Sequence, residues 1–280
     1  MNTLITRTLR RCNLLLVLVL ALPLAAYASL PQTANVPGGI AAIPLANVVG
    51  TAKPQAWLGK QPVLVTADHN QWFAVVGLAL DTRPGPHELR ADIGGTMQTR
   101  QFTVKSKNYP EQHITLKDKG KVVLSARNLA RFKREHKLIT GYEHHWSAAA
   151  NNDLNFILPA KGRVSSRFGL RRFFNGKPRA PHAGLDLAVA RGTPVKASAA
   201  GTVLAADDYF FNGKTVFIDH GNGLVTMYCH LDKFKVKAGQ KVRKGQVVAL
   251  SGMTGRATGP HLHWSVILNG VMVDPDLFVR

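Results

Sequence analysis

The sequence predicts a mostly β fold, with an antiparallel β domain at the C-terminus preceded by a small β-sandwich-like domain and a linker helix. Short apolar runs separated by Gly, Pro and Asn turn signals fill residues 55–117 and 155–280. Helical spacing is confined to residues 125–146. An apolar content of 45% over 280 residues is ordinary for a globular chain and is enough to bury a core.

Residues 1–28 have the pattern of a secretory signal peptide. Three arginines precede a continuous apolar run over residues 14–22, and Ala26-Tyr27-Ala28 offers a small-x-small cleavage site. An uncleaved membrane anchor is the alternative, but the run is shorter than the ~20 residues of a span, and Pro23 interrupts its end. We therefore expect export to the periplasm or cell envelope.

The chain is strongly basic, with 36 Lys and Arg against 16 Asp and Glu and a formal charge of +20. Such an excess favours contact with an anionic partner. Nucleic acid, anionic lipid and anionic wall polymer all qualify by charge alone. Because the chain is expected to be exported, we predict contact with envelope polymers or a membrane surface and no nucleic acid.

An internal disulfide is excluded once the signal is removed. Cys12 lies within residues 1–28, so Cys229 is the only remaining cysteine. The fold must then be stabilised by its core, with or without a metal.

Residues 29–117 are predicted to form the N-terminal accessory β domain. Residues 29–50 are rich in Ala, Pro and Gly and indicate little regular structure. Apolar runs at residues 63–65 and 72–80 indicate strands, the second ended by Pro- and Gly-rich turn residues. No cluster of residues in this domain suggests catalysis.

Residues 118–152 are predicted to be a linker containing a basic amphipathic helix. Ser125 is a candidate N-cap, and Leu129, Phe132, His136 and Ile139 follow near helical spacing with Arg and Lys between them. A role at a membrane surface stays open, but a packed linker helix is favoured.

Residues 153–280 are predicted to be an antiparallel β domain that carries the chemistry. Five of the eleven histidines fall between residues 182 and 263, in three small clusters and a turn: His182, His220, His230, His261 and His263. Side chains two residues apart share one face of a strand, so His261 and His263 point the same way, and so do His182 and Asp186 if one strand runs through both. On a helix, residues two apart would point roughly 200° apart.

Two histidines and one carboxylate match the three protein ligands of a catalytic zinc site, which leaves a fourth position open. Bound Zn²⁺ lowers the pKa of a coordinated water to roughly 7 and polarises a carbonyl. The chain has no His-Glu-x-x-His motif, so the usual glutamate base is missing. The spare histidines His230 and His261 must then serve as base, acid or oxyanion donor.

Residues 155–280 resemble the catalytic domain of the M23 peptidases, the lysostaphin-type zinc endopeptidases of bacterial cell walls. The resemblance rests on stretches in the family's order: 166–169 (SRFG), 182–186 (HAGLD), 192–195 (GTPV), 228–231 (YCHL), 245–246 (GQ) and 255–263 (GRATGPHLH). It implies that His182, Asp186 and His263 hold zinc and that His230 and His261 are the two catalytic, non-ligand histidines.

Three neighbouring residues receive structural interpretations. His220 lies in a probable turn and is expected to be structural. Tyr228 shares strand parity with His230, so it either lines the cleft or packs in the core. Cys229 has the opposite parity and is expected to point away from the metal as a small buried residue.

The resemblance implies an exported zinc endopeptidase that hydrolyses peptide cross-links of peptidoglycan through a metal-activated water. The alternative is a non-catalytic, wall-binding activator of other hydrolases on the same fold. Stem-peptide cross-links and glycine-rich bridges both remain candidate substrates. The accessory domain is left with three possible roles: occluding the cleft, positioning the enzyme on the wall, or adding stability.

Overall fold

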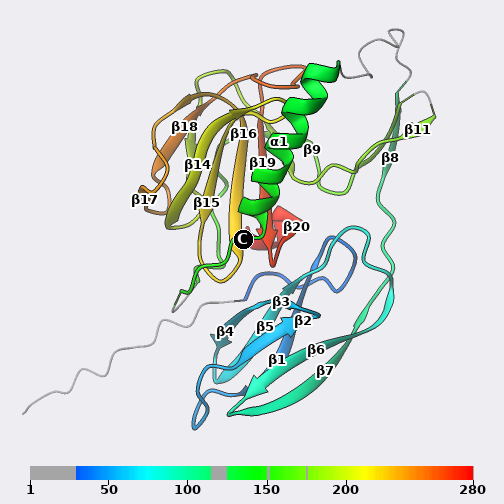
Figure 1. Ribbon diagram of the computed structural model, residues 1–280, viewed down its shortest axis with the longest axis vertical. Coiled ribbons are helices and arrows are strands. Elements are labelled where there is room, and N and C mark those ends of the chain that lie inside the picture. The colour runs from blue at the N-terminus through cyan, green and yellow to red at the C-terminus, as the bar shows by residue number, and fades with distance from the viewer. Residues whose placement is uncertain (1–29, 115–124, 150–151, 175, 280) are drawn as a thin grey trace, which may run out of the picture.

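The computed structural model describes residues 30–114, 125–149, 152–174 and 176–279. The proposed signal segment therefore lies outside the described residues. Within the described residues, no helix is long and apolar enough to cross a membrane. The fold is mostly β, as predicted: Figure 1 shows an N-terminal lobe of strands below a larger C-terminal lobe, with a single long helix across the upper lobe.

Two sheets pack face to face in the N-terminal lobe. One has the order β1-β5-β4 and the other β3-β2-β6-β7. The strands are β1 (Ile40–Asn47), β2 (Gln55–Leu58), β3 (Gln61–Pro62), β4 (Leu64–Asp68), β5 (Gln71–Gly77), β6 (Gly85–Ile93) and β7 (Thr96–Val104). Apolar residues from both sheets share one core, with Ala74 of β5 and Leu89 of β6 fully buried. This confirms the sandwich-like domain.

The expectation of little regular structure over residues 29–50 is wrong. Residues 40–47 form β1, which pairs antiparallel with β5 along its length. Ile40 and Ala41 are fully buried. The Ala- and Gly-rich composition gives a weak strand signal. The apolar alternation is also interrupted where the register shifts between Pro44 and Ala46.

The helix α1 (Ala126–Glu143) matches the predicted linker helix. Ser125 caps its N-terminus, with Oγ accepting a hydrogen bond from the backbone N–H of Asn128 at 3.2 Å. Tyr142 packs against Phe217 of the large sheet, with ring centroids 5.1 Å apart. Leu129 and Leu138 lie on the exposed surface, so only one stripe of the helix is packed.

The C-terminal lobe is built on a large antiparallel sheet with the path β17-β14-β15-β16-β19-β12-β9. Off this path, β18 pairs with both β13 and β16, and β20 pairs with β19. Its elements are β9 (Arg163–Ser166), β12 (Leu185–Ala188), β13 (Pro194–Lys196), β14 (Gly201–Tyr209), β15 (Gly213–Asp219), β16 (Leu224–Phe234), β17 (Lys241–Val242), β18 (Val247–Ser251), β19 (Leu262–Leu268), β20 (Val271–Val273) and the 3₁₀ helix η2 (Pro275–Phe278).

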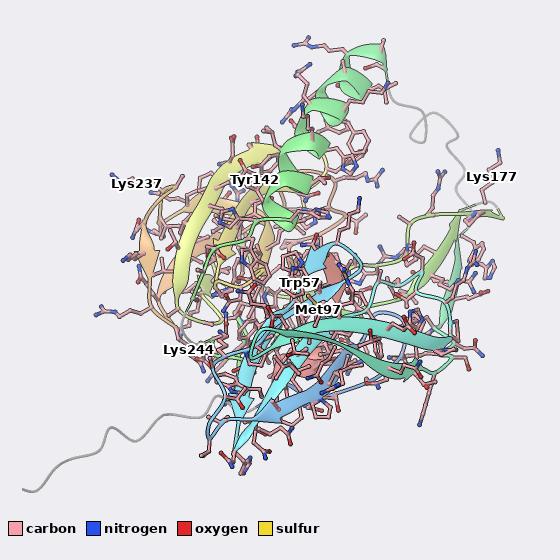
Figure 2. All side chains as sticks on the ribbon, turned by 60° about the horizontal axis from the view of Figure 1, so that its bottom comes forward. Trp57, Met97, Tyr142, Lys177, Lys237 and Lys244 are labelled. Atoms are coloured by element: carbon pink, nitrogen blue, oxygen red, sulfur yellow. The ribbon has the colours of Figure 1, made fainter. Side chains whose placement is uncertain are left out.

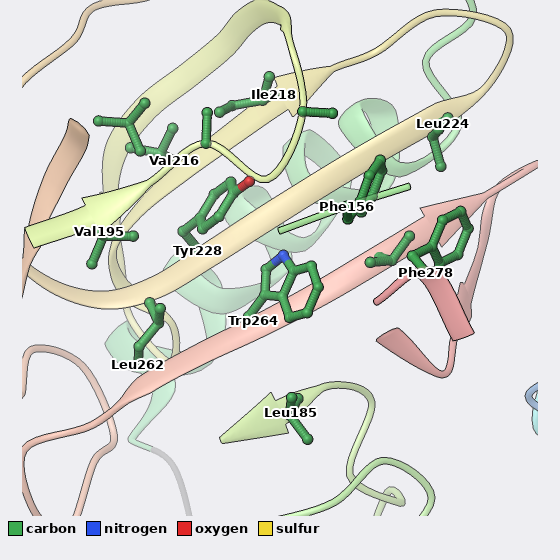
Figure 3. Packing of buried hydrophobic residues seen from close by; sticks show 14 of the residues in the cluster. Phe156, Leu185, Val195, Val216, Ile218, Leu224, Tyr228, Leu262, Trp264 and Phe278 are labelled. Carbon is green, nitrogen blue, oxygen red and sulfur yellow. The ribbon is translucent and has the colours of Figure 1, made fainter. Parts of the chain in front are cut away.

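The two faces of this sheet have different coverings. Cross-strand partners share a face, so Leu185, Trp264 and Tyr228 point together into the main core, where Trp264 and Tyr228 lie side by side (Figure 3). The opposite face carries a smaller cluster that includes Phe217 and is covered by α1. The next cross-strand row on that second face is Asp186, His263 and Cys229, reported below.

The strand β8 (Glu111–Ile114) departs from the predicted domain boundary. It lies within residues 29–117, yet it pairs parallel with β10 (Arg171–Phe174), which in turn pairs with β11 (Lys177–Pro178). Figure 2 shows Lys177 at the far end of this arm. The segment after β7 therefore contributes a strand to a sheet with the C-terminal part of the chain.

The lobes share buried contacts. Ile40, Leu64 and Val75 of the N-terminal lobe belong to the same apolar cluster as Leu268 and Val273. The side chain of Asn269 accepts a hydrogen bond from Gly77 N at 2.7 Å and donates to Gly77 O at 3.2 Å. Gly77 has no room for a Cβ, which would meet Leu268 O at 2.7 Å. The contact between the two lobes is therefore as tightly packed as a protein core.

Candidate metal centre

Three predicted ligands converge where β12 and β19 pair. Asp186 lies opposite His263 in the antiparallel register, and His182 precedes β12 by three residues. Oδ1 of Asp186 is 2.8 Å from Nδ1 of His263 and 3.0 Å from Nε2 of His182, and the two ring nitrogens are 3.1 Å apart. These three residues form the one candidate metal-binding group among the described residues.

Hydrogen bonds on the outer sides of both rings fix which nitrogens face inward. Nδ1 of His182 donates to the carbonyl of Arg167 at 2.8 Å. Nε2 of His263 lies 2.9 Å from Oγ of Ser265, which donates its own proton to Ala183 O. A neutral His263 must therefore place its N–H toward Ser265. The inward nitrogens and the Asp186 oxygen then present three lone pairs to one another, an arrangement that favours a cation bound between them.

This donor set fits zinc. Two imidazole nitrogens and one carboxylate oxygen are the ligand types of catalytic zinc sites. Tetrahedral bonds of about 2.0–2.1 Å place ligand atoms roughly 3.3 Å apart, close to the 2.8–3.1 Å found here. His182, Asp186 and His263 are thus the residues that would hold the ion, with Arg167, Ser265 and Ala183 orienting the rings.

The electrostatics of the site keep Asp186 ionised. Burial alone would raise the pKa of Asp186, but the neighbouring His182 and His263 rings outweigh burial and hold that pKa below its ordinary value. Burial lowers the pKa of His263. An ionised carboxylate beside a neutral imidazole is the state that binds metal.

His230 and His261 lie beside the three ligands and are held in the same tautomer. Nδ1 of His230 donates to Thr254 O at 2.9 Å, and Nδ1 of His261 donates to Gly259 O at 2.8 Å. Both rings therefore carry their Nε2 lone pair away from the backbone. Nε2 of His261 is 4.0 Å from Oδ1 of Asp186. The ring centroids of His230 and His261 are 4.7 Å apart. Burial lowers the pKa of His230 to about 4.

The expected strand parity around these histidines is wrong in one respect. His230 has φ of 60°, in the left-handed region, which breaks the alternation of β16. Tyr228 is fully buried in the main core, whereas Cys229 pairs with His263 and lines the metal-site cavity instead of pointing away from it. Burial raises the pKa of the Cys229 thiol to about 12, so it is neutral, as expected for a small buried residue.

His220 is structural, as predicted. It is buried, its Nδ1 donates to Ala200 O at 2.7 Å, and its Nε2 is 2.8 Å from the hydroxyl of Thr226. Its ring lies on the main-core side, 5.4 Å from the ring of Phe156.

A cavity of about 470 Å³ opens over the metal centre. The helix α1 forms one wall with Phe132 and His136, and the hairpin between β14 and β15 forms another with Phe211. Arg172 and Arg256 also line it. Phe132 and His136 were predicted as residues of the helix, and Arg256 lies within the motif stretch 255–263, but their places in the cavity wall were not predicted. The helix and the β10 arm reach the cavity through long-range packing.

Comparison with known proteins identifies the family over most of the chain. A solved structure of a proposed M23 peptidase from Pseudomonas aeruginosa superposes with a TM-score of 0.75 and 40% identity, covering 88% of this chain and 96% of that one. The chain belongs to the M23 peptidase family. Within it, the profile of the M23 N-terminal domain matches residues 33–107 and that of peptidase family M23 matches residues 180–275, so the latter contains all four site histidines and Asp186.

This M23 protein also resembles named relatives over its C-terminal part. It is 48% identical over 116 residues to the peptidoglycan DD-endopeptidase ShyA of Vibrio cholerae, which is 41% of this chain. It is 42% identical over 113 residues to the DD-carboxypeptidase/endopeptidase Mpg of Neisseria meningitidis. The matched segments cover 27% and 26% of those proteins.

Proposed function

We propose that this M23 protein is a zinc endopeptidase that hydrolyses peptide cross-links of peptidoglycan. The observation that carries the proposal is the joint placement of three ligand atoms within about 3 Å of one another and two further imidazoles beside them in one cavity. Metal-assisted hydrolysis needs a complete set of metal ligands and, beside it, side chains that can accept and donate a proton. The three ligand residues and the imidazoles of His230 and His261 meet both needs.

The chain's own residues would divide the work as follows. When bound, zinc supplies Lewis acidity for the scissile carbonyl and makes a coordinated water more acidic. His230 and His261 present an unprotonated Nε2 to the cavity, so either ring accepts a proton from the attacking water. The protonated ring then donates to the oxyanion or to the leaving amine. The hydrogen bonds to Thr254 and Gly259 hold the rings in this tautomer.

The substrate and location are inferred from charge, export signal and relatives. The names of ShyA and Mpg describe enzymes that act on DD bonds. We propose the same class of bond as the substrate here, an amide between two residues of D configuration. The strongly basic chain and the signal-like start suit work in the periplasm or cell envelope, against peptidoglycan and other anionic polymers. The non-catalytic activator is the competing function, and the filled ligand positions disfavour it.

Digestion of purified sacculi, with zinc content measured on the same samples, tests this function. The wild type should bind about one zinc per chain and release cross-linked fragments identified by mass spectrometry. His261→Ala and His230→Ala should keep zinc and lose about 10²-fold or more in turnover. His263→Ala should lose both.

The exposed His69, changed to Asn because its φ is positive, is the matched control and should alter neither quantity. Sacculi bound but not cut by the zinc-loaded wild type would replace the hydrolase with the activator. Loss of zinc by His261→Ala with retention by His263→Ala would reverse the assigned roles.

A further inference from the structure

Arg256 places a guanidinium at the wall of the metal-site cavity. It lies on the loop between β18 and β19, five residues before His261, and lines the same cavity as that histidine. Its Cζ lies over the ring of Phe211, 4.2 Å from the ring centroid. A guanidinium packed over an aromatic ring keeps its fork of N–H donors available for a ligand.

This guanidinium has no acidic partner. Within the described ranges, no carboxylate lies within 4.0 Å of Arg256, whereas Arg131, Arg167, Arg171 and Arg191 each pair with one. Three carboxylates line the cavity. Glu135 pairs with Arg131 and accepts from Phe210 N, Asp186 faces the histidines, and Glu143 forms no ion pair with Arg256 among the described residues. Burial and the charge of Arg179 lower the pKa of Arg256, so a bound anion would stabilise its charged form.

The loop carrying Arg256 is held in place before any substrate binds. The backbone N–H of Arg256 donates to Phe211 O at 2.9 Å. Oγ1 of Thr254 accepts from Lys214 N at 2.9 Å and donates to Leu231 O at 2.7 Å. Phe211 is itself in contact with Phe132 of α1, with ring centroids 5.1 Å apart. An arginine anchored in this way loses little entropy when it binds a ligand.

We propose that Arg256 is a specificity residue that binds a free carboxylate of the peptide substrate adjacent to the scissile amide. The inference rests on the proposed function. In an amide between two D residues, the residue that supplies the nitrogen carries its own α-carboxyl group, one carbon from the bond to be cut. A guanidinium in the cavity wall is matched to that group by charge and by its planar fork. Neutral glycine bridges and amidated peptides lack this charge.

A pair of synthetic D-alanyl–D-amino acid peptides tests the proposal, identical except for a free α-carboxylate or a carboxamide on the nitrogen-supplying residue. The wild type should have a kcat/KM about 10- to 100-fold higher for the carboxylate. In Arg256→Gln this ratio should fall to near one, and Arg256→Lys should give an intermediate ratio, because lysine keeps the charge without the fork. Arg163→Gln, an exposed arginine of β9 outside the cavity, is the matched control and should keep the wild-type ratio.

Binding of the same two peptides, measured by calorimetry on the zinc-loaded protein, separates this proposal from the proposed function. Tighter binding of the carboxylate peptide that disappears in Arg256→Gln supports the subsite even where no peptide is cut, an outcome that would count against the endopeptidase alone. A preference that persists in Arg256→Gln shows that the carboxylate is recognised elsewhere and overturns the proposal. Equal binding of both peptides by the wild type overturns it as well.

Discussion

Asp186 of β12 lies directly opposite His263 of β19, with its Oδ1 2.8 Å from Nδ1 of the histidine. The pairing register therefore sets the metal site. A slip of one residue would bring Leu262 or Trp264, which are fully buried in the main core, to the position of His263. The large core residues on one face of the sheet thus hold the ligands in register on the other.

The charge of Asp186 is expected to be essential for metal binding. Asp186→Asn keeps the shape of the side chain but replaces an anionic ligand with a neutral amide, so zinc affinity should fall by about 100-fold or more. Competition with a chromophoric chelator measures the affinity. Asp232→Asn, which removes an exposed ion pair with Arg191, is the control and should leave affinity unchanged. Unaltered affinity in Asp186→Asn would exclude this residue as a ligand.

Ser265 is expected to tune zinc affinity without touching the ion. Its Oγ accepts from Nε2 of His263 and donates to Ala183 O. Ser265→Ala frees the ring to change orientation and tautomer, and should weaken zinc binding roughly 10- to 100-fold. Ser198→Ala, at a serine equally buried on the other face of the sheet, should destabilise the fold without changing zinc affinity. Identical affinities in both variants would remove Ser265 from the site.

His220, which lies outside the metal centre, should make the free energy of unfolding depend on pH. Burial lowers its pKa in the folded state, so below about 6.5 the unfolded chain takes up a proton that the folded chain does not. Stability is thus lost as the pH falls through the unfolded pKa, by at most about 1.4 kcal/mol per pH unit. The free energy of unfolding of His220→Gln, measured from pH 7.5 to 5, should decline less steeply than that of the wild type. Parallel curves would contradict the assignment.

Asn269 is expected to couple the two lobes. Asn269→Ala removes two buried hydrogen bonds to Gly77 and leaves a left-handed φ of 44° on a residue that disfavours it. We expect a loss of roughly 1–3 kcal/mol in unfolding free energy by denaturant titration. Asn269→Gly removes the same bonds without the backbone strain and should lose somewhat less. Wild-type stability in both would mean that the lobes are not held together here.

Much of the site follows from the sequence because its signals are local. His182, Asp186, His261 and His263 lie in short motifs on or beside strands, and period-two spacing relates His261 to His263. His182 lies three residues before β12, so the strand does not run through both His182 and Asp186. His230 is different: its φ of 60° turns the side chain out of the alternation, so parity arguments misplace its neighbour Cys229. A single left-handed residue in a strand leaves no reliable sequence signal when it is not glycine.

Long-range packing accounts for what the sequence did not predict. Residues 111–114 pair with β10 some 60 residues later along the chain, and the composition of neither segment specifies that partner. Phe132 and His136 were expected on a helix, and they are, but their place in the cavity wall depends on how α1 packs across the sheet. That residues 153–280 fold alone and keep the metal site is a further prediction. The core shared between Ile40 and Leu268 shows which surface such a fragment would expose.

The most direct test of the central claim is a chelation and restoration experiment on one preparation of the full chain, read out by sacculus digestion and by zinc content. We expect about one zinc per chain, loss of fragment release when a chelator removes it, and recovery of both on adding stoichiometric zinc, with His263→Ala failing to recover either. A folded, metal-free protein that releases cross-link fragments at the original rate would contradict the account.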